Sequence, residues 1–92
     1  MIVNYYATLR QVVGTRQVEL DLPPGGTLRQ LVDEMIRRYP SLKREMLDPQ
    51  GSLYGHIHIF VNGLDSTLLD GSLDSVLEPG DTISIFPPVG GG

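Results

Sequence analysis

Hydrophobic and polar residues alternate in several stretches of this 92-residue chain, a pattern typical of β-strands with one buried face. The alternation is clearest where Val18, Leu20 and Leu22 interleave with polar residues. Alternation and β-branched or aromatic composition together predict strands at 2–9, 16–22, 56–63 and 82–86, with a short edge strand within 66–71. The first two segments are close in sequence, so we expect an antiparallel hairpin.

A second pattern, with apolar residues three and four apart, predicts the main helix. Its apolar stripe consists of Leu28, Leu31, Val32, Met35, Ile36 and Tyr39. Thr27 is placed to cap the N-terminus, Gln30 completes a capping box, and Pro40 ends the helix near Tyr39. Shorter helical segments are expected at 8–14, which ends in a glycine suited to a left-handed cap, at 41–47, and within 72–81 before a Pro-Gly turn.

The order of these elements predicts an α+β fold of the β-grasp, ubiquitin-like type. We expect a mixed sheet of about four to five strands with the one main helix packed on one face. Because the chain shows no internal repeat or linker, it is expected to form a single domain over residues 1–86, followed by a flexible C-terminal tail at 87–92.

Strand alternation also predicts an aromatic patch on the sheet face turned away from the helix. In the first strand, Val3, Tyr5 and Ala7 are expected to share one face, with Asn4 and Tyr6 on the other. The outward residues of the several strands are Tyr6, His58, Phe60 and Phe86. Exposed apolar patches often mark partner surfaces. A register slip of one residue would instead turn Tyr6 or Phe60 inward.

Composition narrows the classes of function. Seven basic and eleven acidic residues leave a net charge of −4, which argues against a general nucleic-acid or anionic-membrane binder. The absence of cysteine excludes disulfides, thiolate metal sites and cysteine nucleophiles. No stretch approaches the roughly 18 apolar residues of a membrane helix, and no leader pattern opens the sequence. We therefore expect a soluble cytoplasmic protein.

Candidate catalytic and metal-binding residues are sparse. His56 and His58 are two apart on a predicted strand and are expected to point to the same side, but zinc sites take three or four ligands and the spacing supplies no third. We therefore expect no metal site. The serines lack a nucleophile elbow, and acidic residues such as Asp65 fall in predicted turns, where Asp is common. The chain is not expected to be an enzyme.

The C-terminal sequence "FPPVGGG" is unusual for an ordered domain. Pro87 and Pro88 favour an extended chain that leads away from the sheet. The residues that follow are Val89, Gly90, Gly91 and Gly92, a thread almost without side chains that ends in a carboxylate. Such a thread can enter a narrow channel in a partner protein, where any Cβ would clash. A frayed terminus or a cloning remnant is the alternative, and composition alone leaves both open.

Three motifs, "YYATLRQVVG", "VNG" and "ISIFPPVGGG", resemble the ubiquitin-like sulfur-carrier family. That family includes the small subunit of molybdopterin synthase (MoaD), the thiamine sulfur carrier (ThiS), a cysteine-biosynthesis carrier and the small archaeal-type modifiers. The resemblance covers essentially the whole chain, and the tail is its most specific element. One departure is Gly90, where the family often has Ala, Ser or Thr.

The resemblance implies a mechanism for the tail. A ubiquitin-activating-type enzyme would use ATP to adenylate the Gly92 carboxylate, and sulfur transfer would convert it to a thiocarboxylate. Gly90 and Gly91 would line the activating channel, Phe86 would anchor the sheet face against the partner, and Tyr6 and Arg10 would lie near that surface. The resemblance implies no permanently bound cofactor, because the partner uses the ATP.

The resemblance leaves several pathways open. The leading expectation is the small subunit of molybdopterin synthase, with the large synthase subunit as partner. One alternative is a modifier joined through Gly92 to lysines of target proteins. Others are a sulfur carrier for thiamine, cysteine or tRNA thiolation, and a binding module with an inert tail.

Overall fold

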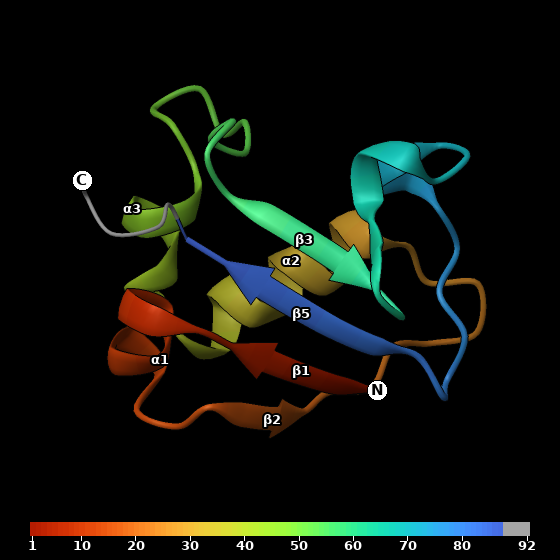
Figure 1. Cartoon of the computed structure of the whole chain (residues 1–92), viewed down its shortest axis with the longest axis horizontal. Coiled ribbons are helices and arrows are strands. Elements are labelled where there is room, and N and C mark those ends of the chain that lie inside the picture. The colour runs from red at the N-terminus through yellow and green to blue at the C-terminus, as the bar shows by residue number, and fades with distance from the viewer. Residues whose placement is uncertain (88–92) are drawn as a thin grey trace.

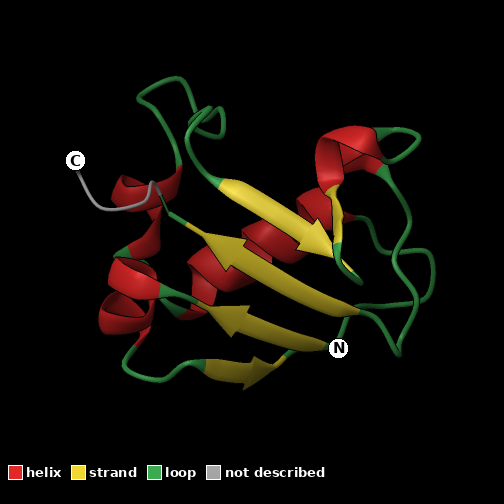
Figure 2. Ribbon diagram, viewed as in Figure 1, coloured by secondary structure: helices red, strands yellow, loops and turns green. Residues whose placement is uncertain are grey.

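A computed structural model describes residues 1–87 of the chain (Figures 1 and 2). The elements in chain order are β1 (Ile2–Tyr5), α1 (Ala7–Val13), β2 (Gln17–Glu19), α2 (Leu28–Arg38), α3 (Leu42–Met46), β3 (His58–Val61), β4 (Leu64–Asp65), η1 (Ser66–Leu68), η2 (Ser72–Asp74) and β5 (Thr82–Phe86). None of the helices between the first residue and residue 87 is long and apolar enough to cross a membrane.

The five strands form one mixed sheet in the order β2-β1-β5-β3-β4. β1 and β5 are parallel neighbours at its centre, whereas the β1–β2, β3–β5 and β3–β4 pairs are antiparallel. The long helix α2 crosses one face of this sheet (Figure 1). The predicted ubiquitin-like β-grasp architecture is confirmed.

The first strand is shorter than its composition suggested. β1 ends at Tyr5, and Ala7, with a φ of 52°, turns the chain into α1. The prediction that Ala7 shares an inward face with Val3 is therefore wrong: Ala7 is exposed. The expected helical segment is confirmed, and it ends at Gly14, whose φ of 89° is the left-handed conformation that glycine adopts readily.

β1 and β2 pair antiparallel as predicted, but α1 lies between them, so they form no tight hairpin. β2 is also shorter than the predicted segment 16–22. It pairs with β1 over three residues only, with Glu19 opposite Ile2 at one end and Gln17 opposite Asn4 at the other. The inward face was predicted correctly, since Val18 is buried.

The capping box of α2 is present. The Thr27 hydroxyl oxygen accepts the Gln30 backbone N–H at 3.2 Å, and the Thr27 N–H donates to Gln30 Oε1 at 2.9 Å. These bonds satisfy two donors that a helix start would otherwise leave unpaired. The helix ends at Arg38, next to the predicted stop, and the residues it buries are Leu28, Leu31, Val32 and Met35.

The edge strand lies earlier than predicted. Asn62 and Gly63, with φ of 51° and 86°, form a two-residue turn that places Leu64 directly opposite Val61. The expectation of a strand within 66–71 is therefore wrong. That segment instead contains the 3-10 turn η1, which the Asp65 side chain caps.

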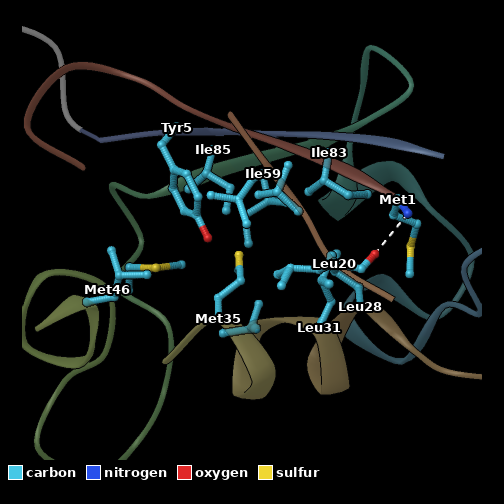
Figure 3. Close-up of a cluster of buried hydrophobic side chains, with 14 of the residues drawn as sticks. Met1, Tyr5, Leu20, Leu28, Leu31, Met35, Met46, Ile59, Ile83 and Ile85 are labelled. Carbon is cyan, nitrogen blue, oxygen red and sulfur yellow. Dashed lines mark hydrogen bonds between the residues drawn. The ribbon is translucent and has the colours of Figure 1, made fainter. Parts of the chain in front are cut away.

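The hydrophobic core lies between α2 and the sheet (Figure 3). Tyr5 is fully buried in it and points between Met35 and Met46 (Figure 3). Among the described residues its hydroxyl has no hydrogen-bond partner, and its ring meets Tyr39 edge-on at 6.4 Å. Burial, followed by the neighbouring Tyr39, raises the pKa of the Tyr5 hydroxyl, so this group stays neutral.

We expect Tyr5→Phe to leave the free energy of unfolding unchanged or to raise it by up to about 1 kcal/mol, because a buried polar group without a partner is costly. Urea denaturation measures this. Tyr6→Phe, at an exposed position, is the control and should change little. A loss above about 1 kcal/mol for Tyr5→Phe would show that the hydroxyl is bonded in solution.

Candidate functional site

Three aromatic rings gather on the sheet face turned away from α2. Tyr6 stacks on Phe86 with ring centroids 4.3 Å apart and an interplanar angle of 14°. Phe60 meets Phe86 edge-on, at 5.4 Å and 90°. The preceding residues on these strands, Tyr5 and Ile59, are buried in the core, so the predicted register holds and the alternative slip is excluded.

A shallow groove of about 600 Å³ runs along this aromatic cluster. Its lining residues are His58, Phe60, Gly63, Asp65, Ser84, Phe86 and Pro87. His58 is exposed and lies opposite Phe86 in the β3–β5 register. Pro87, the first residue of the predicted tail, is buried and lies in the groove wall. The groove thus lies immediately before the C-terminal segment.

Asp65 places a negative charge at the β4 side of the groove. Its carboxylate accepts the Thr67 backbone N–H at 2.9 Å and the Thr67 hydroxyl at 2.8 Å. These two hydrogen bonds, first the backbone and then the hydroxyl, and the nearby His58 lower the pKa of the Asp65 carboxyl. The edge of the groove therefore remains anionic at neutral pH.

Arg10 and Arg16 lie on the other side of the aromatic cluster. Both line a recess of about 360 Å³, together with Asn4, Tyr5, Tyr6 and Gln17. Arg10, predicted from the family resemblance to lie near the partner surface, is exposed and on α1. Sequence reasoning did not single out Arg16. The sequence predicted a strand that begins at Arg16, but it gave no sign that this residue lies in one recess with Arg10.

The two histidines are not brought together on one strand. β3 begins at His58, two residues later than predicted, and His56 precedes it with its ring stacked on Tyr54 at 4.9 Å. Within residues 1–87 no three His, Cys, Asp or Glu side chains are grouped as a metal site would require.

The described site has an aromatic centre and charged edges. The remaining predicted site residues, Pro88, Val89, Gly90, Gly91 and Gly92, lie outside the described residues. Their roles in the tail stay predictions.

We expect Asp65→Asn to lower the midpoint of urea denaturation at pH 7, because the charged carboxylate accepts both Thr67 bonds. The folded pKa of Asp65 lies below its ordinary value of 3.8, so its stabilisation is present above that value and is lost as pH falls through the folded pKa. The difference between wild type and variant should therefore shrink toward pH 3. In a Thr67→Val background, which lacks the hydroxyl donor, Asp65→Asn should lower the denaturation midpoint by a smaller amount. A difference between wild type and Asp65→Asn that does not shrink at low pH would contradict this assignment.

Comparisons with known proteins agree with this architecture. The ThiS family model matches residues 3–92. The chain is 31% identical over 87 residues to small archaeal modifier protein 1 of Haloferax volcanii, covering 95% of this chain and 94% of the relative. It is 30% identical over 70 residues to the sulfur carrier protein CysO of Mycobacterium tuberculosis, covering 74% of each.

Solved structures show the same similarity. The crystal structure of SAMP1 from Haloferax volcanii superposes with a TM-score of 0.89 at 30% identity, covering 100% of this chain and 98% of that one. A candidate molybdopterin converting factor, subunit 1, from Pyrococcus furiosus gives 0.76 at 33% identity, covering 96% and 95%. The BexX/CysO complex of Amycolatopsis orientalis gives 0.81 at 28%, covering 99% and 98%. With a family match across nearly its whole length, the chain belongs to the ThiS family of small ubiquitin-like carrier proteins.

Proposed function

We propose that this protein is a sulfur carrier whose C-terminal Gly92 carboxylate is adenylated by a partner enzyme and converted to a thiocarboxylate. The observation that carries the proposal is the aromatic cluster of Tyr6, Phe60 and Phe86, which ends directly at Pro87. A partner that docks on this face receives the C-terminal segment beside its point of contact. The match to the ThiS family and the relative described as a sulfur carrier support the same function.

The chemistry explains why such a carrier needs a partner. A carboxylate is a poor electrophile, since its leaving group would be an oxide. Attack of the Gly92 carboxylate on the α-phosphate of ATP forms an acyl-adenylate and releases pyrophosphate. Hydrosulfide, or a donor that delivers sulfur at the same oxidation level, then attacks the acyl carbon; AMP leaves, and the product is the thiocarboxylate. The carrier supplies the acyl group, and the enzyme binds ATP and provides the acid–base groups.

The pathway proposed first is molybdopterin synthesis, with the large synthase subunit as the sulfur-accepting partner. The Pyrococcus furiosus structure, described as a candidate molybdopterin converting factor, supports this assignment. Conjugation through Gly92 to lysines of target proteins fits equally, because another relative is described as a modifier. Sulfur transfer for cysteine synthesis has the CysO relative in its favour. All of these uses begin with activation of the same carboxylate.

The intact mass of the protein from its own host tests the shared step. Replacement of one carboxylate oxygen by sulfur adds about 16 mass units, as thiocarboxylate formation by acyl transfer requires. Because methionine oxidation adds nearly the same mass, fragmentation must place the shift on Gly92. A chain lacking Gly91 and Gly92 is the control and should show no shift at its terminus. An unmodified terminus, with larger species linked through Gly92, would favour the modifier.

We expect Phe86→Ala to weaken binding to the host's adenylating enzyme by roughly 30-fold, because an aromatic anchor at the centre of an interface contributes about 2 kcal/mol. Isothermal titration calorimetry measures the dissociation constant. Leu68→Ala is the matched control, since Leu68 is 71% exposed and does not line the groove. Equal affinities for Phe86→Ala and wild type would remove this face from the proposal.

A further inference from the structure

We propose that Arg10 and Arg16 form a recess that binds an Asp or Glu side chain of the adenylating enzyme. With Asp65 at the opposite edge, this recess makes the docking face electrically asymmetric and so determines the orientation in which the enzyme binds. The inference rests on the proposed function, because it needs an enzyme that docks on the aromatic cluster.

The strand registers show that the charged groups lie on one face. Gln17 lies opposite Asn4, Asn4 opposite Ser84, Ser84 opposite Phe60, and Phe60 opposite Asp65. This row crosses the sheet from β2 to β4. It lies on the side turned away from α2, because the residues that alternate with it along the strands pack in the core. Arg10 and Arg16 lie at the β2 end and Asp65 at the β4 end.

The basic recess is continuous with the aromatic cluster. Tyr6 lines the recess and also stacks on Phe86. Within the recess lining, Gln17 Nε2 donates to Asn4 Oδ1 at 2.9 Å, so these two amides bond to one another. A partner side chain that enters the recess therefore lies next to the apolar contact, where partial exclusion of water strengthens a charged interaction.

Among the described residues, the two recess arginines have no acidic partner, a feature that they share with Arg38 and Arg44 but not with Arg29 and Arg37. Arg29 pairs with Asp74 at 2.9 Å, and Arg37 Nε donates to Glu34 Oε2 at 3.0 Å. Within residues 1–87, neither arginine of the recess forms such a pair. Two arginines that line one recess, on a chain of net charge −4, make this edge locally basic.

A carboxylate is the ligand that suits this recess. The guanidinium group presents planar paired donors that match the two oxygens of a carboxylate, and the pair excludes a cationic partner group. Opposite charges at the two ends of the face also disfavour docking rotated by half a turn, which would place the partner's acidic group against Asp65. In the favoured orientation, Pro87, where the described chain ends, meets one defined place on the enzyme.

The test uses ATP–pyrophosphate exchange by the host's adenylating enzyme, with the full-length carrier as substrate. The double variant Arg10→Gln/Arg16→Gln should raise the KM for the carrier roughly tenfold, with kcat retained, because charge pairs at an interface act on binding. The double variant Lys43→Gln/Arg44→Gln removes the same charge from α3, outside the groove and recess, and should leave KM unchanged.

The outcomes separate the two proposals. If wild-type carrier supports no exchange, the proposed function fails, and this inference fails with it. If Phe86→Ala raises KM but the arginine double variant does not, only the inference is overturned. A rise in the KM for ATP, with the KM for the carrier unchanged, would show that the recess binds a nucleotide phosphate and would also overturn it. If the Lys43→Gln/Arg44→Gln variant raised the KM for the carrier equally, the net charge of the chain would account for the result, and the inference would be overturned.

A cross-linking experiment identifies the acidic group directly. Lys43 is the one lysine in the sequence, so the Lys43→Arg background removes the side-chain amines, and Arg16→Lys then introduces one at the recess. A carbodiimide should join that amine to an Asp or Glu of the adenylating enzyme, and peptide mass spectrometry locates the link. The wild-type chain, whose lysine lies on α3, is the control and should form no link at this position. If the Arg16→Lys chain gave no greater yield of cross-link to the enzyme than the control chain, the assignment would be contradicted.

Discussion

The parallel pairing of β1 with β5 is the interaction on which the rest of the structure depends. It joins the first strand to the last in a register that places Val3 beside Ile83 and Tyr5 beside Ile85, all of which are buried against the helical layer. Because the strands run in the same direction, the chain leaves β1 for α1 and leaves β5 for the C-terminal segment at the same end of the sheet (Figure 1). Tyr6 therefore lies on Phe86, although eighty positions separate them.

The same strands have opposite roles on their two faces. The inward residues are mainly aliphatic and supply the burial that stabilises a small domain, whereas the outward residues near the end of β5 are aromatic and partly exposed. Exposed aromatic rings add little to the stability of the isolated chain, and stacking on one another limits how much of them meets water. This division is expected of a protein that works by docking.

In the function that we propose, the carrier contributes a surface and a terminus, and the partner contributes the reaction chemistry. Such a division of labour requires that the surface place the terminus correctly. An apolar patch alone is weakly directional, because hydrophobic contact has no preferred orientation. The basic recess and Asp65, at opposite edges of the aromatic cluster, supply the direction that the rings lack.

Local sequence was sufficient to predict the Thr27 capping box, the left-handed cap at Gly14, and the inward and outward faces of β3 and β5. Each depends on contacts within a few residues, where spacing and side-chain chemistry are sufficient. Tertiary structure decided where β1 ends, which residues form β4, and that Arg16 lies in one recess with Arg10. These features depend on pairing between segments that are distant in sequence. The free energy of that pairing has contributions from the whole sheet and core, so a local pattern of residues does not predict it.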